Sequence, residues 1–139
     1  YQNAIRCFEK ALEKDPKFTD AKIQLASCYV EGSPDPMKGI TMLKELEKTD
    51  SNNVQVQMVL GNFAVKSGQL DKAEARYNKV LKIQPDYLEA YLFLADVYER
   101  KGDKAKTIEV LEKYVILTPD KEIKEQVRTY IEQLKKTNV

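Results

Sequence analysis

The side chains that most often perform catalysis are either missing from this sequence or spaced as they are on a solvated surface. There is no His and no Trp among the 139 residues, which excludes His-dependent acid–base catalysis, Ser-His-Asp and Cys-His nucleophiles, and imidazole metal sites. Carboxylates, lysines and tyrosines are plentiful, but runs such as Glu109, Glu112 and Lys113 are typical of wet helix faces. No glycine-rich phosphate loop, nucleophile elbow or metal-ligand cluster is present. We therefore expect no enzyme activity, no cofactor and no metal.

Cysteine content and charge exclude further classes of function. Cys7 and Cys28 form no CxxC pair and both fall in apolar helical patterns, so small buried packing residues are favoured over a single disulfide. Lys and Arg total 23 against 22 Asp and Glu, a formal charge of +1, which provides no broad basic surface for nucleic acid. No apolar run approaches the roughly 20 residues of a membrane span. We expect neither nucleic acid binding nor membrane insertion.

The first residue, Tyr1, already lies in a helical pattern, with no signal-like stretch before it. We interpret the chain as a fragment of a longer one. Because a targeting segment would lie upstream, the compartment stays open between the cytoplasm, slightly favoured, and the periplasm.

A period of 34 residues organises the sequence. Pro85 and Pro119 are 34 residues apart, as are Gly68 and Gly102. Each period holds two amphipathic helical patterns, A and B, joined by a short turn, which predicts antiparallel helix pairs. The A patterns cover 19–31, 54–67 and 88–101, and the B patterns cover 1–14, 36–49, 70–83 and 104–117. Neither helix can bury its apolar stripe alone, so the sequence predicts an all-α stack of helix pairs.

Small residues recur at one position of each helix type. These positions hold Ala26, Gly61 and Ala95 on the A helices and Ala4, Gly39, Ala73 and Thr107 on the B helices. Glycine inside a helix costs about 1 kcal/mol relative to alanine. The glycines at 39 and 61 therefore indicate that paired helices approach closely at these positions.

This pattern resembles the tetratricopeptide repeat, whose signature is W-x2-L-G-x2-Y, then A-x3-F, then P. The third unit matches with Gln57, Leu60, Gly61, Ala64, Gly68, Ala73, Tyr77 and Pro85, and the fourth with Tyr91, Leu94, Ala95, Tyr98, Gly102, Thr107, Leu111 and Pro119. The departures are the missing Trp, Thr107 at a small-residue position and Ser51 in place of a proline. The resemblance implies a right-handed superhelical α-α solenoid. It divides the chain into a truncated first repeat at 1–18, repeats at 19–53, 54–87 and 88–119, and a capping helix with its tail at 120–139.

The two ends of the chain carry different expectations. A helical pattern from Asp120 to about Lys136 has its apolar residues on one side, namely Ile123, Val127, Tyr130, Ile131 and Leu134. Arg128 occupies its small-residue position, which no further helix could approach, so we expect a solvating cap with a structural role. The first helix lacks its A partner, and Tyr1, Ile5 and Phe8 should lose part of their cover. We expect this face either to self-associate, as a homodimer or a weak aggregate, or to dock the missing upstream helix.

The resemblance implies that the A helices line a concave groove that binds an extended or helical peptide of another protein. By repeat alignment, the groove residues are Ile23, Ser27, Val30, Met58, Asn62, Val65, Leu92, Asp96 and Glu99. Ile23, Met58 and Leu92 would form an apolar row across the groove. Asn62 is the best single candidate because its amide both donates and accepts hydrogen bonds. The alternative interpretation is that the apolar members are covered by neighbouring helices.

The acidic A helices disfavour an acidic ligand. A carboxylate clamp of Lys, Asn and Arg is known in the resembling family, but only Asn62 matches it here, since Glu89 and Phe93 stand at other clamp positions. We therefore expect a neutral, apolar or basic protein segment as partner. RNA binding is disfavoured for the same reason. The alternative function is a rigid structural subunit that assembles through its convex or terminal faces.

Overall fold

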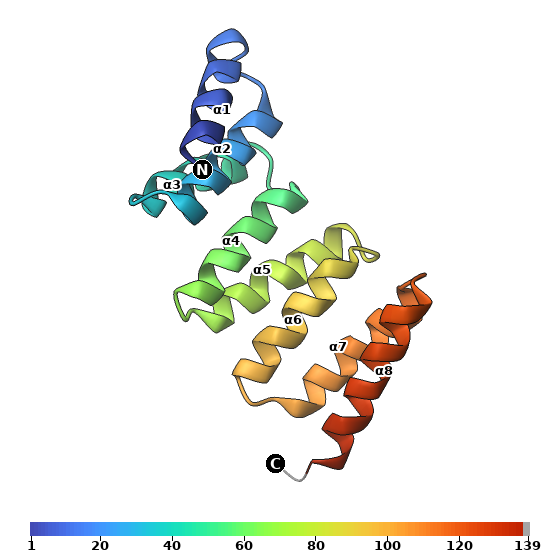
Figure 1. Ribbon diagram of the computed structural model, residues 1–139. Helices are drawn as coiled ribbons and strands as arrows, with labels where there is room; N and C mark the ends of the chain where they lie inside the picture. The colour runs from blue at the N-terminus through green and yellow to red at the C-terminus, as the bar shows by residue number, and fades with distance from the viewer. Residues whose placement is uncertain (138–139) are drawn as a thin grey trace. The chain divides into compact units, whose positions relative to one another are not determined.

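The computed structural model describes residues 1–137, which form eight α-helices and no strand. The helices are α1 (Gln2–Lys14), α2 (Thr19–Gly32), α3 (Pro36–Thr49), α4 (Val54–Lys66), α5 (Leu70–Ile83), α6 (Leu88–Arg100), α7 (Lys104–Leu117) and α8 (Lys121–Lys136) (Figure 1). Every end lies within one residue of the range expected from the sequence. The all-α fold class is confirmed. None of these helices is both long and apolar enough to cross a membrane.

The chain forms two compact units, an N-terminal unit Tyr1–Phe63 and a C-terminal unit Ala64–Val139. The division falls inside α4, after Phe63. The two units are described separately below.

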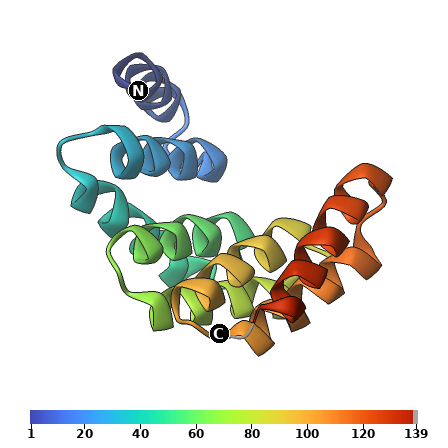
Figure 2. The ribbon, with the colours of Figure 1, turned by 60° about the horizontal axis from the view of Figure 1, so that its bottom comes forward.

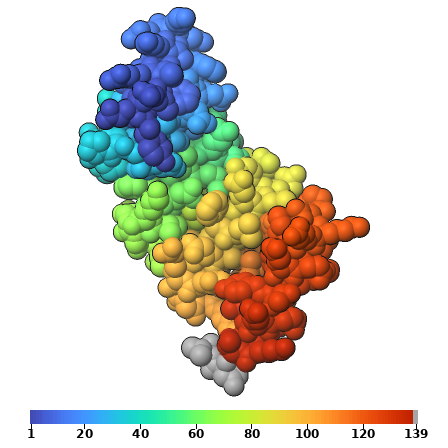
Figure 3. Space-filling model, viewed as in Figure 1, coloured from blue at the N-terminus to red at the C-terminus, as the bar shows by residue number. Residues whose placement is uncertain are grey.

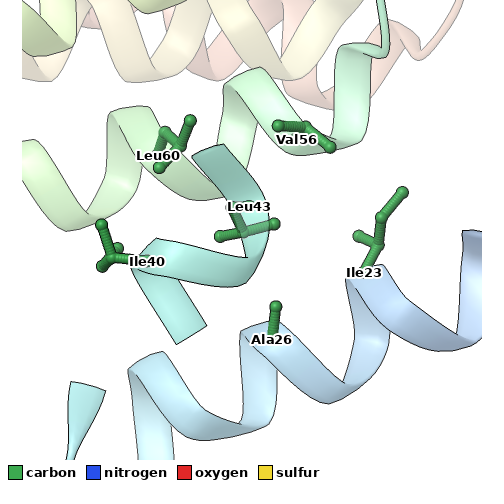
Figure 4. Close-up of a cluster of buried hydrophobic side chains, with 6 residues drawn as sticks. All are labelled: Ile23, Ala26, Ile40, Leu43, Val56 and Leu60. Carbon is green, nitrogen blue, oxygen red and sulfur yellow. The ribbon is translucent and has the colours of Figure 1, made fainter. Parts of the chain in front are cut away.

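In the N-terminal unit, α2 packs against both α1 and α3, which precede and follow it in the sequence (Figure 2). A hydrophobic core joins α2, α3 and the first turns of α4, as Figure 4 shows. Its buried members are Ile23, Ala26, Ile40, Leu43, Val56 and Leu60. The apolar stripes of these helices are therefore buried against their neighbours, as a stacked helical repeat requires.

The close approach expected at the small residues is present between α2 and α3. Gly39 is buried, and a Cβ atom at this position would collide with the backbone carbonyl oxygen of Ala26. The same atom would lie 2.8 Å from Cγ2 of Val30. Glycine at position 39 therefore allows the two backbones to come together, which offsets its weak helix propensity.

One tyrosine links the first three helices. The hydroxyl of Tyr29 on α2 donates to Oε1 of Glu9 on α1 at 2.7 Å. It also accepts a hydrogen bond from Nζ of Lys38 on α3 at 3.0 Å, and Nζ lies 4.4 Å from the centre of the tyrosine ring. Both the hydrogen bond and the negative charge density of the ring favour the charged ammonium. The hydrogen bond to the Tyr29 hydroxyl is the main cause of the raised pKa of Lys38.

α1 is less well covered than the other helices of this unit. It has no buried residue, because only α2 packs extensively against it. Cys7 is exposed and Cys28 is half-buried, and both are free thiols. The expectation that both cysteines are buried packing residues is therefore wrong for Cys7. The sequence predicts the apolar side of α1, but the neighbouring helices do not bury that side.

In the C-terminal unit, α6 packs against α5 and α7, and α7 packs against α8 (Figure 2). The turns after α4 and α6 contain Gly68 and Gly102, with φ of 77° and 75°. Positive φ at these positions lets the chain reverse, and the amide after each glycine closes the turn. For example, the Asp103 amide donates to the carbonyl oxygen of Tyr98 at 2.9 Å. The glycines 34 residues apart are thus equivalent turn residues.

The last two helices begin with aspartate caps. Asp103 accepts from the Lys106 amide at 3.1 Å, and Asp120 accepts from the amides of Glu122 and Ile123. Thr107 occupies its small-residue position fully buried, and its hydroxyl donates to the Asp103 carbonyl oxygen at 2.8 Å. This hydrogen bond satisfies the buried hydroxyl, so threonine fits where the repeat pattern has alanine.

Helix α8 covers α7, but its apolar side is only partly enclosed. Ile131 is its one buried residue, whereas Ile123 and Tyr130 are exposed. Arg128 is exposed and donates to Oε1 of Glu125 at 2.8 Å, in the same helix. The exposed polar residues of α8 are consistent with a solvating cap. Ile123 and Tyr130 leave apolar area of α8 accessible to solvent.

Candidate functional site

A cleft of about 380 Å³ lies between α6 and α8 in the C-terminal unit. Figure 3 shows the face on which α8, in red, lies beside the yellow surface of α6. Residues from three helices line the cleft: Leu92, Ala95, Asp96 and Glu99 of α6, Leu111 of α7, and Gln126, Val127 and Tyr130 of α8.

Helical spacing explains how α6 contributes one apolar and two acidic side chains to the cleft. Leu92, Asp96 and Glu99 are four and three residues apart, which places them on one face of the helix. Leu92 is 39% exposed, although leucine is usually buried. Val127 and Tyr130 are three residues apart on α8 and face the cleft from the other side. The cleft thus combines an apolar floor with carboxylates.

A hydrogen bond spans the cleft. The Tyr130 hydroxyl donates to Oε1 of Glu99 at 2.5 Å. This bond to the carboxylate, with burial and the Glu99 charge as smaller causes, raises the pKa of Tyr130 to about 12. Asp96 pairs with Nε of Arg100, one helical turn away, at 3.0 Å. A carboxylate has about four lone-pair sites, so both acids can accept further hydrogen bonds.

Phe93, the residue after Leu92 on α6, is not part of the cleft lining. It is exposed on one side and stacks on Tyr77 of α5 on the other, with ring centres 5.6 Å apart and planes at 18°. Tyr77 is fully buried, and burial, with the Asp96 charge as a second cause, raises its pKa. The stacking packs α6 against α5.

Comparison with known proteins identifies the fold. The protein-family model described as "Tetratricopeptide repeat" matches residues 39–122, which is more than half of the chain. The chain belongs to the tetratricopeptide repeat family. This confirms the resemblance found in the sequence, and with it a helical repeat protein with a protein-interaction role.

Curated relatives share the repeat over part of their length. The chain is 27% identical over 81 residues to the chloroplastic tetratricopeptide repeat domain-containing protein PYG7 of Arabidopsis thaliana, covering 58% of the chain and 27% of that protein. It is 25% identical over 114 residues to the interferon-induced protein with tetratricopeptide repeats 3 of Mus musculus, covering 81% and 28%. The uncharacterized protein ycf37 of Cyanophora paradoxa is 28% identical over 129 residues, covering 91% and 72%. The chain spans about a quarter of the length of the first two relatives.

Solved structures agree with the fold. A crystal structure of MamA has a TM-score of 0.74 at 24% identity, covering 94% of this chain and 76% of that one. YrrB, described as a tetratricopeptide repeat protein with an unusual peptide-binding site, has a TM-score of 0.72 at 22% identity, with coverage of 93% and 66%. The type III secretion translocator chaperone SycD of Yersinia enterocolitica has a TM-score of 0.71 at 19% identity, with coverage of 91% and 85%.

The groove residues expected on the last A helix of this tetratricopeptide repeat chain lie together. Leu92, Asp96 and Glu99 all line the cleft between α6 and α8. Whether they bind a ligand remains a prediction, taken up below.

Of the residues expected to face the groove on α2, only Ile23 is fully buried, and a ligand role for Ser27 and Val30 stays a prediction. Ile23 is 1% exposed and belongs to the core of the N-terminal unit, and Val30 packs against that core. Ser27 is half-buried, and its hydroxyl donates to the Ile23 carbonyl oxygen of its own helix at 2.9 Å. The alternative interpretation, that neighbouring helices cover these positions, is correct for Ile23. Ile23 is covered because residues of α3 and α4 share its core.

The residues expected on α4 are also largely enclosed. Met58 is 6% exposed, and Asn62 and Val65 are half-buried. The apolar row of Ile23, Met58 and Leu92 therefore keeps only Leu92 at the surface. Asn62 is the best single candidate from the sequence, and its role in binding a ligand stays a prediction.

Sequence reasoning did not assign Gln126, Val127 and Tyr130 to the site. The apolar spacing of Val127 and Tyr130 was recognised, but α8 was interpreted only as a structural cap. A signal was present, since a helix built like an A helix has a side that faces the preceding A helix. Within residues 1–137, no group of three or more Cys, Asp or Glu residues is placed to hold a metal ion.

Proposed function

We propose that this chain is a non-catalytic protein-interaction module that binds a peptide or helix of a partner protein in the cleft between α6 and α8. The observation that supports this proposal is that Leu92, Asp96 and Glu99, selected from the sequence as ligand-facing, line one cleft with Val127 and Tyr130. Binding pockets typically combine an apolar lining with a few polar groups that fix orientation.

The lining determines the chemistry of the ligand. Leu92 and Val127 offer an apolar floor for one anchoring side chain. Glu99 and Asp96 beside it favour a lysine or arginine of the ligand and repel a carboxylate. The partner segment is therefore apolar and neutral or basic rather than acidic.

Selection from a displayed peptide library on the purified chain tests the proposal. Selected peptides should combine a large apolar residue with a neighbouring Lys or Arg. Their affinity should fall at least about tenfold for Leu92→Gln, as expected for an anchor contact. The Glu99→Lys variant should reverse the charge preference and select acidic peptides.

The matched control is Met37→Gln, which changes an exposed apolar residue of α3 in the N-terminal unit that does not line the cleft. It should leave affinity unchanged. Enrichment of acidic peptides by the unmodified chain, no enrichment at all, or equal affinity for the Leu92→Gln variant would show that the cleft is not the recognition surface.

A second candidate function is an assembly element that packs as a rigid subunit through its terminal faces. The structure offers exposed apolar residues at both ends, which favours it. α1 has no buried residue, with Tyr1 exposed and Ile5 and Phe8 half-buried, so self-association through these three residues remains a proposal. An assembly contact would be large and dry, whereas a groove ligand would bury a single extended segment.

A further inference from the structure

A second cleft, of about 490 Å³, lies between α7 and α8 and plays no part in the proposed peptide site. Its apolar lining consists of Val115, Ile116 and Ile131. Val115 and Ile131 are buried, but Ile116 is 78% exposed. Ile116 is thus a large aliphatic side chain exposed at the edge of a cleft whose other apolar residues are buried, and it leaves apolar area that a contact would bury.

The charges around this cleft balance. Two acids, Glu112 and Glu132, and two bases, Arg128 and Lys135, line it. Lys135 Nζ of α8 and Glu112 Oε1 of α7 form an ion pair at 3.3 Å, with each side chain about half exposed. A patch that carries equal numbers of both signs does not attract a strongly acidic or basic partner. A second copy of the patch complements it in an orientation that places opposite charges together.

The spacing of two charges along α8 allows two copies of the chain to pair symmetrically. Arg128 pairs with Glu125 of its own helix at 2.8 Å and excludes a closely packed further repeat helix, but a contact bordered by ion pairs needs no such close approach. Arg128 and Glu132 are four residues apart, one turn along α8, with opposite charges. When two copies of α8 run antiparallel about a two-fold axis midway between these residues, Arg128 of each copy faces Glu132 of the other. A two-fold contact uses the same patch on both subunits and makes each contact twice.

We propose that the cleft between α7 and α8 is the interface of a symmetric dimer of this chain. Ile116 of each copy packs into the other copy's cleft against Val115 and Ile131, and two reciprocal pairs of Arg128 with Glu132 border the apolar contact. None of the residues lining this cleft lines the α6–α8 cleft, so the dimer can form while a peptide is bound.

Sedimentation velocity over a range of concentrations tests the dimer. The unmodified chain should shift from monomer to dimer as concentration rises. Ile116→Glu should weaken the dimer at least about tenfold, because it buries a charge in the apolar contact. Met37→Glu is the matched control: Met37 is also an exposed apolar residue, but it lies on α3 of the N-terminal unit. It should leave dimerisation unchanged.

Charge reversal distinguishes a two-fold contact from any other. Arg128→Glu leaves three acids and one base around the cleft, and Glu132→Arg leaves one acid and three bases, so each variant alone should remain monomeric. An equimolar mixture of the two should recover a heterodimer. Circular dichroism of each variant should match that of the unmodified chain, because Arg128 and Glu132 are exposed.

Several outcomes would overturn the proposal. These are an unmodified chain that stays monomeric at every concentration, a dimer that persists in Ile116→Glu, and charge-reversed variants that do not recover when mixed. A dimer that is lost in Ile5→Glu but kept in Ile116→Glu would place self-association on α1 instead. If Leu92→Gln loses peptide binding but still dimerises, the dimer interface and the peptide site are independent of each other.

Discussion

Tyr130 of α8 donates its phenolic hydrogen to Oε1 of Glu99 on α6, and this hydrogen bond connects two helices that are separated in the sequence by all of α7. The bond crosses the cleft that we propose as the peptide site. The position of α8 therefore depends on α6 as well as on α7, and a ligand in the cleft contacts both partners of the bond.

Alkaline pH should weaken this link. The pKa of Tyr130 is raised from 10.0 to about 12 in the folded chain, so its contribution to stability is complete below about pH 10 and is lost as pH rises through about 12. Tyr130→Phe, which removes the bond, should lower the free energy of unfolding by about 1 kcal/mol or less at neutral pH.

Urea denaturation of the unmodified chain and of Tyr130→Phe, at neutral pH and at about pH 11, measures this effect. The difference in unfolding free energy between the two proteins should shrink at the higher pH. An equal difference at both pH values would contradict the assigned hydrogen bond.

Gly39→Ala should destabilise the N-terminal unit although alanine is the better helix former. The new Cβ would collide with the Ala26 carbonyl oxygen, and overpacking of this kind costs about 1–3 kcal/mol. The gain in helix propensity, about 1 kcal/mol, does not offset a collision with backbone. Chemical denaturation measures the net change in the free energy of unfolding. Ala75→Gly, on an exposed position of α5, gives the propensity effect alone, and a more stable Gly39→Ala protein would refute the close approach.

Substitutions at Gly102 test the effect of backbone conformation alone, without an effect of side-chain packing. Its φ is 75°, and no atom lies within 4 Å of a Cβ built at this position. Gly102→Ala should therefore cost about 1–2 kcal/mol through backbone strain alone, whereas Gly102→Asn should cost less because asparagine tolerates the left-handed conformation. Unfolding midpoints of the two variants decide the matter. Equal losses would mean that something other than φ selects glycine here.

The helices could be predicted from the sequence because every constraint on them is local. The 34-residue spacing of Gly68 and Gly102 marks equivalent turns, and aspartate caps such as Asp103 mark helix starts. Even Thr107 departs from the repeat pattern, but its buried hydroxyl is satisfied by a hydrogen bond to the carbonyl oxygen of Asp103 at the start of the same helix. Such features follow from neighbouring residues, so the helix bounds needed no knowledge of distant contacts.

The site was predicted only in part because accessibility depends on contacts between helices. Ile23 and Leu92 occupy equivalent repeat positions, yet one is buried in a core and the other is exposed. Repeat alignment identifies the face of a helix but not how far the next helix extends over it. Tyr130 was missed for the same reason, since its contact with Glu99 depends on where α8 lies on α7.

The hydroxyl of Tyr29 joins a carboxylate of α1 and an ammonium of α3 at a single atom, as described above. Because two of the three groups are ionic and lie near solvent, dissolved salt should compete with them. The contact of Gly39 with the Ala26 backbone carries no net charge and should be indifferent to ionic strength. Concentrated salt is therefore expected to loosen α1 while α2 and α3 stay paired, which hydrogen exchange of the α1 amides can follow.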